Sequence, residues 1–182
     1  MQELEEQVRA YAEGRPMEAN VLPVASLPVH HQIAFNLIPH IDVFQDLGYT
    51  KEEWKMVHEA RKILGAPDLK VSPTTVRVPV LRSHSESINV ETERYVSADD
   101  LRAVLQSAEG VEVVDDPERL EYPMPWQASG KDPVFVGRIR QDPTVENGIN
   151  MFVVGDQIRK GAALNAVQIA ERALADGHLR AR

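Results

Sequence analysis

The order in which helical and strand-like segments follow one another most constrains the fold of this 182-residue chain. Apolar spacing and stop signals predict a helix, an extended stretch, a second helix, two strands, a helix, three strands and a final helix. A regular parallel sheet needs strands and helices that alternate, and this order lacks that alternation. The sequence therefore predicts an α+β fold, with a mixed, largely antiparallel sheet and helices on one face.

Four segments have the apolar spacing of amphipathic helices. They cover residues 2–13, 50–64, 97–109 and 156–174. The second has a capping-box signature, because Thr50 is followed three residues later by Glu53. The last has a broad, alanine-rich apolar face. Packing within the chain would explain that face, and so would a partner domain or subunit.

Five shorter segments alternate or concentrate apolar residues as strands do. They cover residues 76–81, 88–93, 111–116, 134–140 and 149–154. Pro79 indicates an edge position or a bulge in the first of these, because proline has no N–H to donate to a ladder. Prolines also break residues 19–41, which are expected to be extended or irregular, and residues 117–133 are expected to form a long surface loop.

Acidic residues outnumber basic ones, 28 to 20, which gives a formal charge of −8. Nucleic acids and anionic membranes are bound by basic surfaces, so neither is expected as a partner. The chain has no apolar run of about 18 residues, and its N-terminus lacks the apolar core of a secretory signal. We therefore expect a cytoplasmic protein without a membrane span.

Cysteine is absent, so this chain supplies no disulfide, no thiolate zinc site and no cysteine nucleophile. The six histidines have neither HxxxH nor HExxH spacing, and no metal site is expected. The glycine-rich motifs GxGxxG and GxxxxGK[ST] are also absent. The chain alone is therefore not expected to bind a dinucleotide well.

His84 lies just after one predicted strand and just before the next. An imidazole moves protons near neutral pH, and the guanidinium of Arg77 can hold a carboxylate through two parallel hydrogen bonds. Together they can form half of an active site, and the alternative is a turn histidine and a surface arginine. A Ser83–His84–Glu86 triad is rejected, because residues so close in sequence cannot reach the required geometry and no GxSxG motif is present.

Charged residues follow one side of the second predicted helix. Glu52, Lys55 and Glu59 occupy positions i, i+3 and i+7. Such a row forms either a solvated ion-pair face or a charged rim that faces a polar substrate.

Long segments of the chain resemble the C-terminal part of bacterial aspartate-β-semialdehyde dehydrogenase. The segments are FNLIPHIDVF (35–44), GYTKEEWKMVHEARKILG (48–65), VRVPVLRSHSESINVE (76–91) and KDPVFVGRIRQDPTVENGINMFVVGDQIRKGAALNAVQIAE (131–171). The resemblance implies a fold like the C-terminal domain of glyceraldehyde-3-phosphate dehydrogenase. It also implies NADPH-dependent reduction of β-aspartyl phosphate to aspartate semialdehyde with release of phosphate, in lysine, methionine, threonine and isoleucine biosynthesis.

The resemblance assigns substrate contacts residue by residue. Arg77 matches the arginine that holds the substrate α-carboxylate. Glu52 matches the acidic residue near the substrate amine, with Glu53 as the alternative. Lys55 matches the lysine that binds phosphate together with an arginine elsewhere.

Two further positions match residues close to the reaction itself. His84 matches the acid/base histidine that activates the family's cysteine thiol, and Gln157 matches a residue that reaches the nicotinamide side of NADP. Family members are about twice as long, and the portion without a counterpart here carries the dinucleotide loop, a phosphate-binding arginine and the cysteine. No tight binding of NADP to this chain alone is therefore expected.

The resemblance also implies a domain division and a partner. Residues 1–155 are expected to form a substrate-binding and dimerisation domain, and residues 156–182 a helix that packs on a separate NADP-binding domain. We expect a homodimer that is a truncated form of the dehydrogenase and is inactive by itself. The alternative is a non-catalytic dimerisation module, or one half of a split enzyme.

Overall fold

The computed structural model describes residues 1–179, which fall into two compact units. The first unit is Met1–Leu81, and the second begins at Arg82. Residues 180–182, the end of the predicted C-terminal segment, lie outside the described part. None of the described helices has the length and apolar character needed to cross a bilayer.

The first unit begins with helix α1, Gln2–Ala12, as the apolar spacing predicts. Its Leu4 packs with Ile33, Ala34 and Ile38 in a small core. Ile33, Ala34 and Ile38 belong to the proline-broken stretch, which contains no regular strand, as predicted. The helix thus provides the apolar surface on which an irregular segment folds.

Gln7 on α1 ties this irregular stretch to the helix through its buried side chain. Its Oε1 accepts hydrogen bonds from the N–H groups of Ile33 and Ala34, both at 2.9 Å, and its Nε2 donates to Glu18 O at 2.7 Å. Backbone groups without a strand or helix partner need such side-chain partners when they are buried. The side chain of Gln7 therefore provides hydrogen-bond partners that a neighbouring strand would otherwise provide to this stretch.

Helix α2, Lys51–Ile63, follows a short 3-10 turn, η1, at Asp46–Gly48. The predicted capping box is confirmed: Thr50 Oγ1 accepts from Glu53 N, and Glu53 Oε2 accepts from Thr50 N. Both residues are buried, so the start of α2 is fixed more firmly than its exposed end.

The predicted strand at residues 76–81 is wrong. The structure has a single antiparallel bridge there, between Ile38 and Arg77, and no strand. Pro79 cannot donate to a ladder, and Val78 and Val80 are exposed where a strand in a core would bury one face. Alternating valines therefore mark an extended segment here and not a sheet.

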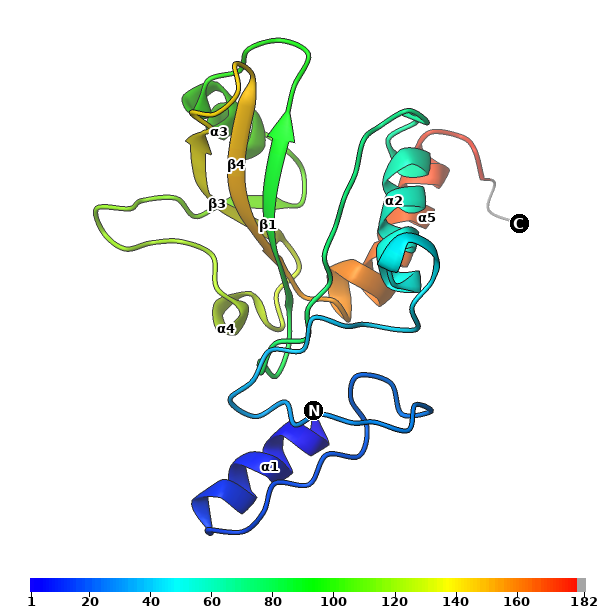
Figure 1. The fold of residues 1–182 in the computed structure, drawn as a ribbon. Helices are drawn as coiled ribbons and strands as arrows, with labels where there is room; N and C mark the ends of the chain where they lie inside the picture. The colour runs from blue at the N-terminus through cyan, green and yellow to red at the C-terminus, as the bar shows by residue number, and fades with distance from the viewer. Residues whose placement is uncertain (180–182) are drawn as a thin grey trace. The chain divides into compact units, whose positions relative to one another are not determined.

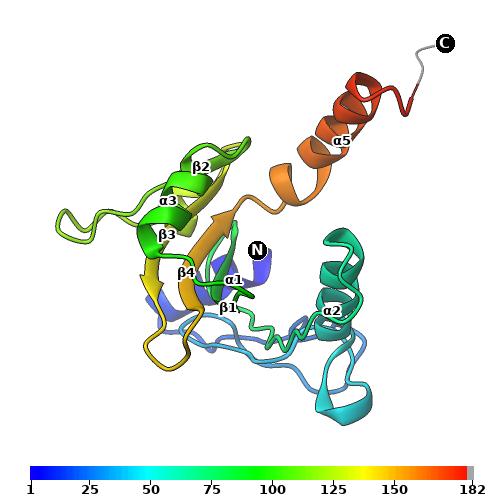
Figure 2. The same cartoon turned by 90° about the horizontal axis from the view of Figure 1, so that it is seen from above.

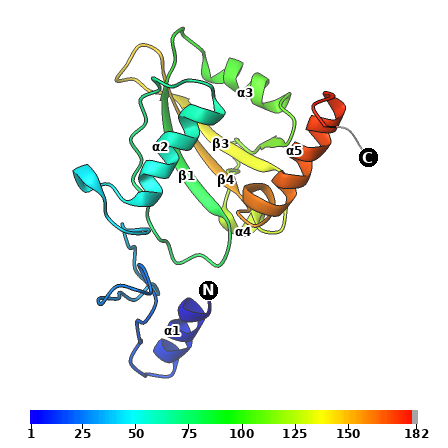
Figure 3. The ribbon, with the colours of Figure 1, turned by 90° about the vertical axis from the view of Figure 1, so that its right-hand side faces the viewer.

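The second unit contains a four-stranded sheet in the order β1-β4-β3-β2. Figures 1 and 3 label β1, β4 and β3, and Figure 2 also labels β2. The strands are β1 at His84–Glu91, β2 at Val111–Val113, β3 at Val134–Gln141 and β4 at Gly148–Gly155. β1 and β3 both pair antiparallel with β4, and β2 pairs parallel with β3. The predicted α+β fold with a mixed, largely antiparallel sheet is confirmed.

Helix α3, Ala98–Gln106, begins after the predicted cap Ser97 and packs on one face of this sheet (Figure 1). Val136, Ile139 and Ile149 form the buried centre beneath it. The four-residue helix α4, Pro125–Ala128, lies within the segment predicted as a loop. Ala128 of α4 packs against Phe135 and Val154, which point to the opposite face of the sheet because neighbouring strand residues alternate.

A bulge interrupts the pairing of β3 with β4 between Gly137 and Arg140. Asp115, whose side chain is only 1% exposed, accepts from Arg138 N at 2.6 Å and from Ile139 N at 3.2 Å. Its carboxylate also pairs with Arg102 Nε of α3 at 2.7 Å. One buried aspartate therefore holds both the bulge and the helix that covers it.

The C-terminal segment differs from the single predicted helix. A π-helical turn, η2, spans Arg159–Ala163, and the regular helix α5 spans Leu164–Ala175 (Figure 2). No residue of α5 is buried, and Val167 and Ile169 are more than half exposed. Within the described residues, internal packing therefore does not account for the apolar face of this helix.

The close approach of β3 to the segment after β2 yields the first prediction. A Cβ at Gly137 would overlap the carbonyl oxygen of Val114, whereas a Cβ at Gly155 would meet Val134 at an ordinary 3.8 Å. Gly137→Ala is expected to lower the free energy of unfolding by about 3 kcal/mol, because the backbone must move. Gly155→Ala is the matched control and should cost less than about 1 kcal/mol. Urea unfolding of both variants measures this, and equal losses would contradict the stated cause.

Candidate functional site

Glu52 and Lys55 lie in the first turns of α2 and contact each other. Lys55 Nζ is 3.4 Å from Glu52 Oε1, and their side chains are 54% and 34% exposed, respectively. An exposed pair at this separation contributes little to stability. Both groups therefore remain available to a ligand, as the predicted charged rim requires.

Lys55 also lines an open groove in the first unit. The other lining residues are Gln45, Asp46, Lys51, Trp54 and His58. Trp54 stacks on His58, with ring centroids 5.7 Å apart. The groove thus combines cationic side chains with a fixed aromatic wall.

Glu53 differs from its neighbour Glu52 because both of its carboxylate oxygens accept hydrogen bonds from within the chain. Besides capping α2, its Oε1 accepts from Thr75 N at 2.8 Å and from Thr75 Oγ1 at 3.4 Å. Burial alone would raise the pKa of Glu53, but the hydrogen bonds from Thr50 and Thr75 outweigh burial and lower the pKa below 4.5. Glu53 is therefore a structural anchor, and it fixes the chain two residues before Arg77.

Arg77 is held by its backbone and leaves its side chain exposed. Its N–H donates to Ile38 O at 2.8 Å, and its own carbonyl accepts from Ile38 N at 3.1 Å. Among the described residues, no hydrogen bond or ion pair engages its guanidinium. A fixed backbone and an open guanidinium suit a side chain that grips a carboxylate.

His84 and Gln157 belong to the second unit, whereas Glu52, Lys55 and Arg77 belong to the first. His84 is the first residue of β1, opposite Gly155 in the register, and its side chain is exposed. The prediction placed His84 between two strands. The structure instead places it at the very start of one.

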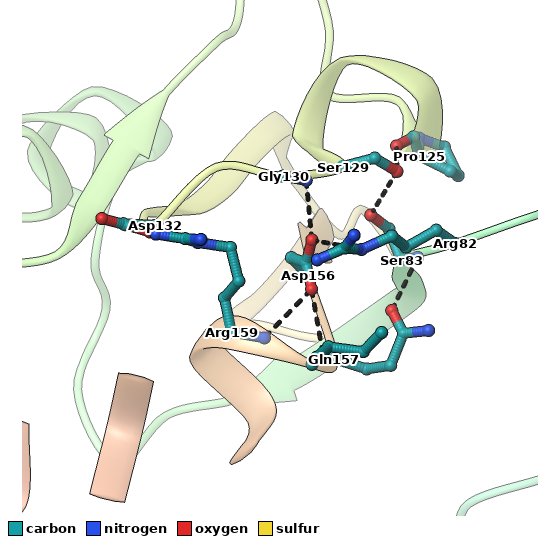
Figure 4. A network of polar contacts seen from close by, with 10 residues as sticks. Arg82, Ser83, Pro125, Ser129, Gly130, Asp132, Asp156, Gln157 and Arg159 are labelled. Carbon is teal, nitrogen blue, oxygen red and sulfur yellow. Dashed lines mark hydrogen bonds and ion pairs between the residues drawn. The ribbon is translucent and has the colours of Figure 1, made fainter. Parts of the chain in front are cut away.

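Ser83 connects His84 to Gln157. The Ser83 N–H donates to Gln157 Oε1 at 2.7 Å, across 74 positions in sequence (Figure 4). Because an N–H can only donate, the oxygen of the Gln157 amide must face Ser83, and its NH₂ group must point away. The NH₂ group is therefore the part of the Gln157 amide that is directed away from Ser83 and can donate to a ligand.

The hydroxyl of Ser83 is also engaged. Ser129 Oγ donates to Pro125 O at 2.7 Å and lies 3.0 Å from Ser83 Oγ (Figure 4). A serine has one hydroxyl proton, so Ser83 must donate its own proton to Ser129. Ser83 is thus turned away from the role of a nucleophile activated by His84, in agreement with rejection of the triad.

Glu86 shares the face of the sheet on which His84 begins β1, because residues two apart in a strand point the same way. Its partner in the register is the apolar Val153 of β4. Burial raises the pKa of the Glu86 carboxyl, and the nearby His84 acts in the opposite direction. The Glu86 carboxyl thus lies close enough to His84 to be affected by its charge, and no hydrogen bond joins the two side chains among the contacts of the described residues.

Asp156 is a site residue that sequence reasoning missed. It directly follows β4 and is fully buried, and its carboxylate lies 2.7 Å from Arg82 Nε. Burial alone would raise the pKa of Asp156, but backbone N–H groups, that of Gly130 foremost, together with Arg82 lower it to about 2. An aspartate immediately before a helix is a recognisable cap signal. Nothing in the sequence marks its pairing with Arg82.

A family model for the semialdehyde dehydrogenase dimerisation domain matches residues 1–160. The aspartate-semialdehyde dehydrogenase of Aquifex aeolicus (strain VF5) is 53% identical over 178 residues, which are 97% of this chain and 50% of that protein. The chain thus spans about half the length of the curated relatives it matches.

Solved structures agree with the family match. A crystal structure of aspartate semialdehyde dehydrogenase II from Vibrio cholerae, complexed with ASA, has a TM-score of 0.87 and 44% identity. The match covers 96% of this chain and 49% of that structure. The enzyme from Candida albicans with NADP has a TM-score of 0.64 at 27% identity, over 81% of this chain and 47% of that structure.

The contrast between two adjacent glutamates on α2 is testable. Glu53→Ala should lower the free energy of unfolding by about 2 kcal/mol, since it removes a buried cap and leaves donors unpaired. Glu52→Ala, the control, should change it by less than about 0.5 kcal/mol. Because its pKa is lowered in the folded state, the Glu53 contribution is full above pH 4.5 and is lost as pH falls below that value. Denaturant titrations at pH 7 and pH 3 measure both effects, and equal losses at the two positions would contradict the assignment.

Proposed function

The chain belongs to the semialdehyde dehydrogenase family and contains its dimerisation domain, and from this we propose that it is the substrate-binding part of an aspartate-semialdehyde dehydrogenase. The proposed reaction reduces β-aspartyl phosphate with NADPH and gives aspartate semialdehyde, phosphate and NADP. The observation that carries the proposal is 53% identity across 97% of the chain to an enzyme of that name.

Three side chains of the first unit are proposed to bind the substrate. Arg77 holds the α-carboxylate, because its guanidinium is exposed on a fixed backbone. Glu52 contacts the substrate amine and Lys55 the phosphate, so opposite charges on one helix face meet a zwitterionic substrate. The occupied carboxylate of Glu53 supports Glu52 as the amine contact.

His84 is proposed as the acid/base group. Its imidazole takes the proton from an attacking thiol, because histidine is the side chain best suited to move protons near neutral pH. It stands at the first position of β1, where the preceding Ser83 is buried and bonded on two sides. The sequence has no cysteine, so the thiol of the proposed reaction comes from outside these 182 residues.

Gln157 is the one residue of this chain that we propose to contact the nicotinamide side of NADP. The cofactor supplies the hydride when it is bound. The outward NH₂ group of Gln157 fits that role, because a carboxamide oxygen can accept from it. The rest of the dinucleotide would be held elsewhere, since this sequence contains no glycine-rich phosphate loop.

The domain division remains part of the proposal. Residues 1–155 would grip the substrate and pair with a second copy of the chain, and residues 156–182 would pack on an NADP-binding domain. The exposed apolar side chains of α5 support this, because they offer a surface for another domain. A cytoplasmic location also belongs to the proposal.

Activity tests the proposed roles. The 182-residue chain alone should not oxidise aspartate semialdehyde with NADP and phosphate, because it has no thiol. Adding the half of the Aquifex aeolicus enzyme that the chain does not match should produce turnover. In that mixture, His84→Ala should lower kcat about 10²- to 10⁴-fold, and Arg77→Lys should mainly raise KM.

Two exposed residues provide the controls for this assay. His31→Ala and Arg119→Lys should leave kcat and KM unchanged. Equal and small effects of His84→Ala and Arg77→Lys would contradict the assigned roles. Turnover by the unmixed chain at a thousandth of a typical rate of ~10 s⁻¹ would contradict the need for an external thiol.

Oligomeric state tests the dimerisation part of the proposal. The chain should elute as a homodimer, since the matching family model describes a dimerisation domain. Gel filtration with light scattering at micromolar concentration measures this. A strict monomer would count against the proposal, and also against a stand-alone dimerisation module.

A further inference from the structure

We propose that Asp156 is a positioning residue, which fixes the two segments that carry His84 and Gln157 without touching the substrate. The proposal rests on the proposed function, because it takes its meaning from the roles assigned to those two residues. Its basis is a set of contacts that converge on one buried carboxylate.

Asp156 collects contacts from three separate segments (Figure 4). From the segment before β1, Arg82 Nε lies 2.7 Å from its Oδ2. From the loop after α4, Gly130 N donates to the same oxygen at 2.6 Å. From the start of the C-terminal segment, Ile158 N and Arg159 N donate to Oδ1 at 2.9 and 3.0 Å. Three segments are thus joined at one side chain.

One path leads from this carboxylate to His84. Arg82 is two residues before His84, and Gly155, directly before Asp156, pairs with His84 in the register. Asp156 is therefore linked to His84 in two ways: through Arg82, on the segment that leads into β1, and through Gly155, at the end of β4. A displacement of the Asp156 carboxylate is therefore expected to move both Arg82 and Gly155.

A second path leads to Gln157 and closes a ring. Gln157 follows Asp156 in the chain, and its Oε1 accepts from the N–H of Ser83, which follows Arg82. The ring therefore runs through one ion pair, one hydrogen bond and two peptide links. Within this ring Ser83 has a φ of +79°, a left-handed conformation that a serine rarely adopts.

A carboxylate is the group that this position requires. Three backbone N–H groups donate to Asp156 and the Arg82 guanidinium forms an ion pair with it, and the two oxygens of a carboxylate can serve all four contacts. An asparagine has one acceptor oxygen, so an NH₂ group would face Gly130 and Arg82. The side chain of the adjacent Arg159 pairs with Asp132, which leaves Arg82 as the cation that balances Asp156.

A matched pair of variants tests the proposal in the 182-residue chain itself. Asp156→Asn is compared with Asp115→Asn, because Asp115 is the other buried aspartate of the same unit and pairs with Arg102 at the bulge. Both variants should lose stability, since each replaces a buried carboxylate and leaves a partly exposed arginine without its charged partner. Only Asp156→Asn should disturb His84 and Gln157.

Nuclear magnetic resonance at neutral pH gives the readouts. In Asp156→Asn, hydrogen exchange of the Ser83 amide should accelerate at least tenfold more than in Asp115→Asn. The side-chain NH₂ signals of Gln157 and the ring signals of His84 should move in the first variant and stay in place in the second. A loss of stability alone would not produce this difference.

Equal behaviour of the two variants at Ser83, Gln157 and His84 would overturn the proposal. If Asp156→Asn fails to fold, Arg82→Gln replaces it, because Arg82 is one-third exposed and contributes a single contact. The same signals should then move, and unchanged signals would overturn the proposal. These readouts need no substrate, so failure of the activity assay would count against the proposed function alone.

Discussion

Pairing of β1 with β4 brings His84 and the C-terminal segment together, and the arrangement of the second unit depends on it. The two strands run antiparallel over eight residue pairs, from His84 opposite Gly155 to Glu91 opposite Gly148. A strand register cannot slip by one residue without moving every side chain to the other face. The ladder therefore fixes which residue of β1 meets the end of β4. The proposed acid/base histidine and the proposed cofactor contact then lie on adjoining segments.

Buried carboxylates secure the irregular parts that such ladders cannot hold. Glu53 anchors Thr75 to the start of α2, Asp115 holds the bulge of β3, and Asp156 joins the ends of β1 and β4. Each accepts backbone N–H groups from a segment remote in sequence. A charged acceptor forms stronger hydrogen bonds than a neutral one, and it becomes costly to lose once buried. The chain thus maintains loop geometry with a few acidic side chains.

The proposed chemistry divides between this chain and a thiol outside it. Exposed side chains of α2 and Arg77 face solvent on a fixed backbone, which suits recognition of a charged substrate. His84 and Gln157 stand beside buried, fully bonded neighbours, which suits groups whose orientation matters for a reaction. The residues proposed for recognition and the residue proposed for proton transfer therefore differ in their structural surroundings.

Local signals in the sequence determined helices α1, α2 and α3, most strands and the family. The capping box of α2, the cap of α3 and the apolar runs of β3 and β4 all involve neighbours in the chain, so their patterns could be read directly. The candidate residues His84, Arg77, Glu52, Lys55 and Gln157 came from their motifs. Only the tertiary structure decided that residues 76–81 form no strand and that the carboxylate of Glu53 accepts hydrogen bonds from Thr50 and Thr75.

The contacts of Asp156 and Gln157 were likewise decided only by the tertiary structure. Ser83 meets Gln157 across 74 positions, and Gly130 meets Asp156 across 26. Hydrogen bonds of this kind depend on which segments the fold brings together, and neither residue type nor spacing encodes the partner. The sequence therefore identified the candidate side chains, and the folded chain decided which of their atoms are engaged in internal hydrogen bonds and which are exposed.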